Sequence, residues 1–329
     1  MEALISFIQR AVIQGTPLLY GSMGETITEK SGNLNLGIPG IMYTGGISGV
    51  IGAFLYERTL APTDTPNVFL SIFLPLVCAL IGSALMSLVY CFLTITLRAN
   101  QNVTGLAITT FGVGVGNFFG GYLAHFSTDG STGVSIAKVS KVFSTPLPFA
   151  EKLGWLGTLL FSYGFLVYVG IFFAIISAVL LKRSRIGLHL RAVGENPATA
   201  DAGGINVSAY KYGATVIGGM IAGLGGLYYV VDYMGVWSND GFGDRGWLAI
   251  AIVIFTLWKP DFGILGSFLF GGLYIIYLFI PDLSRSSQEL FKMLPYVVTI
   301  AVLIFTSIRN KRDSQPPASL GLPYFREER

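Results

Sequence analysis

Polar side chains interrupt the apolar stretches of this chain at a few positions where they could bind a solute. Asn117 lies among glycines, and its amide can bond the hydroxyls and ring nitrogens of a polar molecule. Polar groups at membrane depth are costly and therefore mark functional positions by default. Asn117 could equally bond a neighbouring helix, and that alternative stays open. The residues that we expect to line a solute path are Asn33, Asn35, Asn102, Thr109 and Asn117.

A second polar block, at residues 186–211, carries the signals of a short helix. Pro197 can take the first helical position with Asn196 as N-cap, and Gly203 and Gly204 can end the helix after about two turns. Such a helix buries little surface by itself, so we expect it to dock on another protein. The residues assigned to this docking element are Arg191, Gly194, Glu195, Asn196, Pro197, Ala200 and Asp201.

Catalytic motifs are absent from the sequence. It contains no Gly-x-x-x-x-Gly-Lys-Ser/Thr loop, no Gly-x-Ser-x-Gly elbow and no His-Glu-x-x-His pair. Cys78 and Cys91 share one apolar stretch and indicate neither a disulfide framework nor a metal site. The net charge of +3 is spread over several loops, which excludes a nucleic-acid-binding module. We therefore expect a protein that is not an enzyme and binds no cofactor of its own.

Composition places these residues in a polytopic membrane protein. Of 329 residues, 52% are hydrophobic and only 12% charged, about half the charged share of a soluble domain. We expect an all-α bundle of about nine transmembrane helices. Arg10 weakens the first segment, and residues 233–246 before the short seventh one could be re-entrant. Pro39 should kink the second segment or mark its true start. The segments are residues 4–20, 34–56, 68–97, 103–124, 156–181, 212–231, 247–258, 263–280 and 293–308.

Basic residues predict the orientation of this single transmembrane domain, residues 1–329. The clusters at residues 182–185 and 309–312 lie at span ends, where lysines and arginines favour the cytoplasmic side. This assigns residues 125–155 to an extracellular loop, and residues 186–211 and the tail 309–329 to the cytoplasm. Residues 1–20 lack the pattern of a cleaved signal, so we expect them to belong to the fold.

The docking block resembles a known family. The stretch from Arg191 to Pro197, followed by Ala200, Gly204 and Ile205, is similar to the coupling loop of ABC importer permeases of the branched-chain amino acid, ribose and nucleoside group. In that family the short helix seats in a groove of the ATP-binding subunit and carries its closure into the membrane. The resemblance implies a type II-like importer permease in the bacterial inner membrane, with ATP and Mg²⁺ bound by a partner ATPase. An ordinary connecting loop is the alternative.

Residues 20–40 resemble the same group, in particular permeases of nucleoside importers that work with basic-membrane-protein-type lipoproteins. These usually read Glu-Arg-Ser-Gly-x-x-Asn-x-Gly-x-Glu-Gly, where this chain has Lys30 for the arginine and Pro39 for the second glutamate. The short N-terminus is similar to that of the second of two unlike permeases that pair in such systems. The resemblance implies a nucleoside substrate, a second and longer permease, a cytoplasmic ATPase and an extracellular substrate-binding lipoprotein. Ribose-like sugars and branched-chain amino acids stay open as substrates.

Other polar and aromatic residues allow competing interpretations. We interpret Asp232, Asp240, Asp244 and Arg245 as solvated loop charges; the alternative is a gate or a docking site for a binding protein. Tyr43 could stack on a base, but packing is the simpler interpretation. A secondary transporter working alone would need intramembrane carboxylates, and only Asp232 comes near that requirement.

Overall fold

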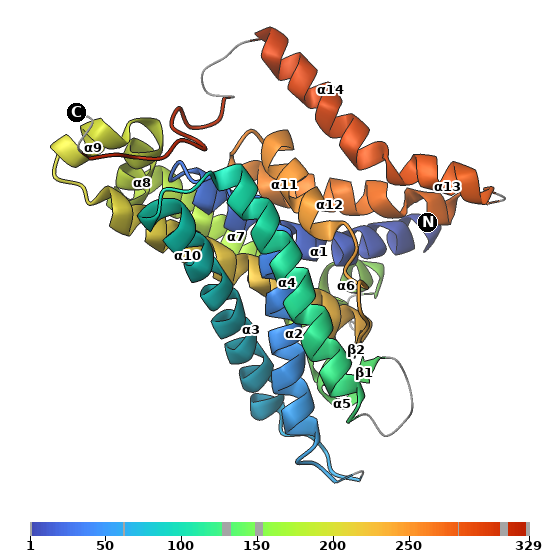
Figure 1. Ribbon diagram of the computed structural model, residues 1–329. Coiled ribbons are helices and arrows are strands. Elements are labelled where there is room, and N and C mark those ends of the chain that lie inside the picture. Colours follow the sequence, from blue (N-terminus) through green and yellow to red (C-terminus); the bar gives the residue numbers. More distant parts are fainter. Residues whose placement is uncertain are drawn as a thin grey trace.

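The structure is a computed structural model that describes residues 2–61, 63–126, 133–148, 154–281, 283–309 and 315–326. Helices dominate these residues (Figure 1). Two short strands, β1 (Val134–Ser135) and β2 (Val236–Trp237), pair antiparallel. The fold is therefore all-α, as expected.

The first half of the chain forms α1 (Glu2–Glu29), α2 (Ile38–Glu57), α3 (Val68–Cys91) and α4 (Gln101–Ala124), followed by the short α5 (Ala137–Phe143) and α6 (Gly154–Phe161). The second half forms α7 (Phe165–Arg183), α8 (Arg185–Glu195), α9 (Pro197–Ala202), α10 (Val207–Leu227), α11 (Arg245–Phe255), α12 (Pro260–Ile275), α13 (Arg285–Lys292) and α14 (Leu294–Arg309). Three helices continue as tighter or wider turns, η1 (Phe92–Thr96) after α3, η3 (Tyr228–Met234) after α10 and η4 (Ile276–Phe279) after α12.

Seven helices of the described residues are long and apolar enough to cross a membrane. The other two predicted segments correspond to α1 and α11. α11 has 11 residues, too few for a bilayer of about 30 Å. α1 is long enough, but it carries polar residues such as Arg10, Glu25 and Glu29. The expected number of about nine spans is thus reduced to seven by this measure.

Two predicted helix boundaries change. The segment 156–181 is not one continuous helix, because a non-helical stretch that ends at Gly164 separates α6 from α7. A Cβ there would lie 2.3 Å from the Asp232 carboxylate and 2.5 Å from the Phe143 carbonyl, so α7 can begin only with glycine at this close approach. The second span begins at Ile38 rather than Leu34. Pro39 lies in its first turn, which confirms that this proline marks the true start.

The helices α1, α2 and α10 form the centre of the bundle. For α2 and for α10 with η3, 83% of the most apolar 18-residue window is buried, against 22% for α3 with η1 and 11% for α13 with α14. Close backbone contact explains this: a Cβ on Gly24 of α1 would lie 2.1 Å from the Gly218 carbonyl oxygen of α10. Figure 1 shows α2, α3 and α4 side by side and α14 projecting from the bundle.

Glycines at helical spacing act in helix packing. Gly219 and Gly223 of α10 face Ser87 and Ser83 of α3, at distances that leave no room for a Cβ. Gly112 lies against the backbone of Gly40 in the same way. These contacts bring α2 and α4 together and so position the side chains described next.

Candidate solute path and coupling site

A pocket of about 190 Å³ lies where α2, α4 and α11 meet the loop at residues 238–244. Aromatic rings and carboxylates share its lining, which is the combination needed to bind a flat, polar solute. It is lined by Pro39, Tyr43, Thr109, Val113, Asp240, Phe242, Gly243, Asp244 and Trp247.

The late start of α2 positions this pocket. The Asn35 side chain accepts a hydrogen bond from the Gly37 backbone N–H (2.9 Å), which holds the turn before the helix. Gly40 then lies against Ile108 and Thr109, in the middle of α4. The Thr109 hydroxyl donates to the Leu36 carbonyl (2.8 Å) and ties the two elements at this level. Tyr43, one turn further, is thereby directed to the C-terminal half of α4.

Three residues close a ring of hydrogen bonds at the edge of the pocket. The Tyr43 hydroxyl donates to Asn117 Oδ1 (2.5 Å), and the Asn117 amide donates to Asp240 Oδ1 (3.1 Å). The Asp240 backbone N–H donates to the Tyr43 hydroxyl (2.9 Å). Trp237 and Phe242 pack edge-on against the Tyr43 ring, with centroids 4.9 and 6.4 Å away. We call Tyr43, Asn117 and Asp240 the rim triad.

The other predicted path residues lie elsewhere. Asn33 and Asn35 are fully buried before α2, where the Asn33 amide donates to the Thr215 hydroxyl (3.1 Å) and the Asn35 backbone N–H donates to Glu25 (3.0 Å). Asn102 is exposed on the first turn of α4, about four turns before Asn117. Of the five, only Thr109 therefore lines the pocket, and Asn117 is hydrogen-bonded to two lining residues, Tyr43 and Asp240.

Two buried glutamates were missed by sequence reasoning. Glu29, which the sequence places in a charged turn, is buried and accepts a hydrogen bond from the Trp258 indole N–H. Glu25 lies one turn earlier and is also buried, and its Oε2 has no hydrogen-bond partner among the described residues. The sequence does carry a signal for such a site, because Glu25 is an acidic residue within an otherwise apolar helix.

The interpretation of the later charges as solvated is wrong for two of them. Asp232 and Arg245 are buried, whereas Asp240 and Asp244 are exposed. The Arg245 guanidinium donates to the Phe242 carbonyl (2.9 Å) and Gln14 Oε1 (3.2 Å), and it stacks on aromatic rings of the core. Its long planar side chain can be buried because these partners replace water.

The docking block has the predicted local structure. Asn196 Oδ1 accepts a hydrogen bond from the Thr199 N–H (3.0 Å), Pro197 opens α9, and Gly204 follows its end with a φ of +82°. Ser184 and Asn206 cap α8 and α10 in the same way. The stretch 186–211 is therefore two helices and the first turn of a third.

Helix α9 has a buried and an exposed side. Ala200 packs with Val193 and Val207, whereas Ala198 and Thr199 are exposed. Of the predicted docking residues, Arg191, Glu195 and Asn196 are exposed, Pro197 and Asp201 are half-buried, and Gly194 and Ala200 are buried. Gly194 contacts the turn after α1 directly, since a Cβ there would lie 2.3 Å from the Lys30 carbonyl oxygen.

The charges at this contact act on Lys30. Partial burial lowers the pKa of the Lys30 ammonium below its ordinary value, the nearby Glu195 carboxylate opposes that shift, and Arg191 adds to it. Two charged residues of α8, Arg191 and Glu195, therefore act on the turn that leads to Asn33.

The end of the chain folds back over α8 and α9, a feature that the sequence did not reveal. Residues 315–326, which we call the C-terminal strap, lie against both helices (Figure 1). Ser319 donates from its backbone N–H (3.0 Å) and hydroxyl (2.6 Å) to the Gly194 carbonyl. Tyr324 donates to Asp201 Oδ2 (2.8 Å), and the Arg326 guanidinium lies 3.2 Å from the same oxygen. The strap, α8 and α9 together form the coupling unit.

Parts of the predicted loops lie outside the described residues. These are residues 127–132 and 149–153 of the loop 125–155, and residues 310–314 and 327–329 of the tail. Within the part of the chain that the structure describes, no group of three or more His, Cys, Asp or Glu could hold a metal ion.

Comparisons with known proteins agree along nearly the whole chain. The family described as the permease component of branched-chain amino acid transport systems matches residues 7–303. The nucleoside ABC transporter permease protein NupC of Lactococcus lactis is 32% identical over 92% of each chain. The guanosine ABC transporter permease protein NupQ of Bacillus subtilis is 29% identical over 100% of this chain and 99% of its own. A putative glucose ABC transporter permease of Haloferax volcanii is 29% identical over 94% of each.

No solved structure matches the chain. Permease subunits of this kind cross the membrane several times and are not enzymes themselves, in keeping with the apolar helices found here. The match covers the pocket, α8 and α9 alike. This chain belongs to the family of branched-chain amino acid transport system permease components.

Proposed function

We propose that this chain is the transmembrane subunit of an ATP-driven importer of nucleosides. The observation that carries the substrate class is the pocket at the rim triad. Tyr43, Phe242 and Trp247 offer rings for a base, and Asp240, which the Asn117 amide holds by a hydrogen bond, offers a carboxylate for hydroxyls and ring N–H groups. The names of the relatives from Lactococcus lactis and Bacillus subtilis support the same class.

The energy for transport comes from partner subunits. A permease component implies a separate ATP-hydrolysing subunit and usually a second permease. In our proposal the ATPase binds ATP and Mg²⁺ and docks on the exposed side of α9. Closure of the ATPase moves α9, and the contact of Gly194 with the Lys30 turn passes this movement to α1 and α2. The path then alternates between outward and inward access.

The proposed assembly is asymmetric and lies in the bacterial inner membrane. The coupling unit and the C-terminus face the cytoplasm, because the basic residues at 182–185 adjoin α8. A longer permease forms the other half of the path, and a lipoprotein delivers the substrate from outside. Another nucleoside ABC transporter permease protein of Lactococcus lactis, NupB, is 22% identical over 89% of this chain and 77% of its own, which supports a pair of unlike relatives.

Uptake competition tests the substrate class. Cells that express the whole complex take up labelled guanosine or uridine, and unlabelled nucleosides, glucose, ribose and leucine compete. We expect competition by nucleosides only. Competition by glucose instead would favour a sugar importer, the substrate named for the Haloferax volcanii relative. Uptake that continues without the ATPase would contradict an ATP-driven mechanism.

A further inference from the structure

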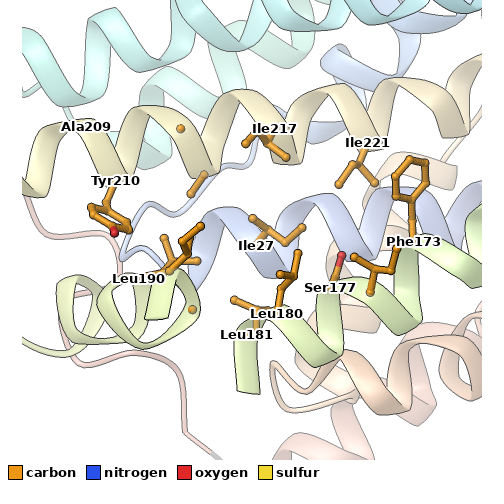
Figure 2. Close-up of a pocket in the computed structure, with 15 residues that line it drawn as sticks. Ile27, Phe173, Ser177, Leu180, Leu181, Leu190, Ala209, Tyr210, Ile217 and Ile221 are labelled. Atoms are coloured by element: carbon orange, nitrogen blue, oxygen red, sulfur yellow. The ribbon is translucent and has the colours of Figure 1, made fainter. Parts of the chain in front are cut away.

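A groove of about 480 Å³ runs between α7, α8 and α10, away from the solute pocket (Figure 2). Its lining side chains are apolar except for Ser177 and Tyr210. Leu180, Ile186 and Ile217 remain exposed in it by 49%, 66% and 55%. Because α7 and α10 are both apolar enough to cross a membrane, a groove between them is open to lipid.

The length of the groove matches one leaflet of a bilayer. Leu190 and Tyr210 lie at one end and Phe173 and Ile221 at the other (Figure 2). Along α10, the 12 steps from Ala209 to Ile221 correspond to about 18 Å at 1.5 Å per residue. Half of the hydrocarbon core is about 15 Å thick. An acyl chain needs that depth, whereas a helix of a partner subunit would need contact over both leaflets.

The end of the groove at Tyr210 is polar and cationic. The Tyr210 hydroxyl and His189 Nδ1 are 2.8 Å apart there, and such amphipathic rings favour the membrane–water interface. Arg183 lies on the same face of α7 as the lining residues Ile176 and Leu180, at helical spacings of seven and three residues. Arg183 and Arg185, which begins α8, are exposed beside the groove.

Lys182 is directed elsewhere. Its ammonium forms a surface ion pair with Asp261 of α12, so a carboxylate already offsets its charge. The two arginines therefore supply the cationic charge at this end of the groove. An apolar slot one leaflet deep, with guanidinium groups at its interfacial end, has the two features of a site for an anionic phospholipid.

We propose that the groove binds one anionic phospholipid from the leaflet on the side of α8 and α9. The acyl chain lies along α10 between Tyr210 and Ile221, and the headgroup phosphate contacts Arg183 and Arg185. Because α8 leads directly into Asn196 and α9, the bound lipid supports the helix on which the coupling unit is built.

Photo-crosslinking in the assembled complex tests this site. The complex is placed in nanodiscs with phosphatidylglycerol that carries a diazirine at the end of one acyl chain, or with the matching phosphatidylcholine probe. We expect phosphatidylglycerol to label the peptides around Phe173 and Ile221. Replacement of Arg183 by Gln should reduce this labelling about fivefold, the effect of one basic residue at an anionic interface, and leave phosphatidylcholine labelling unchanged.

Glycine variants show whether the groove itself is occupied. A Cβ on Gly213 of α10 would meet no atom within 4 Å, so Gly213→Leu fills the groove without a clash and should abolish the labelling. Gly121→Leu on α4 is the matched control, since Gly121 also has open space and does not line the groove. Equal labelling by the two lipids, or labelling that persists in Gly213→Leu, would overturn the proposal. Labelling of the isolated chain but not of the complex would do so too, because a second permease would then cover the groove.

Discussion

The rim triad and α9 are built in opposite ways. The bonds of the rim triad join Tyr43 to Asn117, 74 positions away, and Asp240 to Tyr43 across 197 positions. The cap of α9 joins Asn196 to Thr199, three positions on. The solute pocket thus exists only when distant elements meet, whereas α9 follows from its own sequence. A substitution in the pocket should therefore change the KM for the substrate. A substitution in the coupling unit should change the uptake per ATP hydrolysed.

The largest effect is expected at Gly194, where the coupling unit touches the turn after α1. In Gly194→Val the new Cβ would meet the Lys30 carbonyl, and α8 must move away from this turn. Overpacking of this kind costs about 1–3 kcal/mol, so we expect nucleoside uptake to fall by about fivefold to a hundredfold. Pull-down of the ATPase with the variant complex measures whether docking is lost as well.

Gly203→Ala is the matched control for this substitution. Gly203 has a negative φ, and a Cβ there would approach the Ala200 carbonyl oxygen no closer than 3.4 Å. Uptake should stay near wild type. If Gly194→Val transported normally, the contact between α8 and the Lys30 turn could not be the route of energy transfer.

The next effect is expected at the rim triad. Asn117→Ala removes one acceptor and one donor and leaves Tyr43 and Asp240 without that partner. Loss of such hydrogen bonds costs about 1–1.5 kcal/mol, which corresponds to a roughly tenfold rise in the KM for uptake. ATPase association should not change.

Asn102→Ala is the control that shows whether the effect on KM is specific to the rim triad or common to all of α4. Asn102 is exposed on the first turn of the same helix, and its replacement should leave KM unaltered. A rise in KM for Asn102→Ala, with none for Asn117→Ala, would place the path at the opposite end of α4. It would also remove the pocket as the substrate site.

Sequence reasoning reached the parts of the molecule that local signals specify. The cap at Asn196 and the start of α2 at Pro39 both depend on spacing within one helix. It also selected Asn117 and Thr109, because polar groups in apolar segments are rare. Sequence reasoning could not predict that these residues meet Tyr43 and Asp240 at one site.

Long-range contacts explain where the sequence predictions failed. Arg245 follows Asp244 directly in sequence, which predicts a loop charge, but its guanidinium donates to Gln14 and to the carbonyl of Phe242 in the core. The strap is polar and rich in turns, and only its contacts with Gly194 and Asp201 reveal its place. Such partners depend on how the helices are arranged in space. A single sequence does not contain that information.

A smaller effect is expected at the cap of α9, where two functions of Asn196 can be separated. Asn196→Ala removes the hydrogen bond to the Thr199 N–H and should weaken the helix by about 1 kcal/mol. We expect uptake per ATP hydrolysed to fall about threefold to fivefold. Asn196→Ser keeps a capping oxygen and should restore it. If Ser and Ala behaved alike, the exposed amide of Asn196 would act by contact with the ATPase and not as a cap.

The smallest effects are expected at the strap, where they decide whether long-range contacts matter in the coupling unit as they do in the pocket. Tyr324→Phe removes the half-buried hydrogen bond to Asp201 and should lower uptake per ATP hydrolysed by about fivefold or less. Arg326 contacts the same carboxylate, but its side chain is 74% exposed, so Arg326→Gln should have almost no effect. KM for the nucleoside should be unchanged in both, because neither residue lines the pocket at the rim triad. A Tyr324→Phe complex with wild-type coupling would mean that α9 is positioned by its caps and its buried Ala200 alone, and that the strap only covers it.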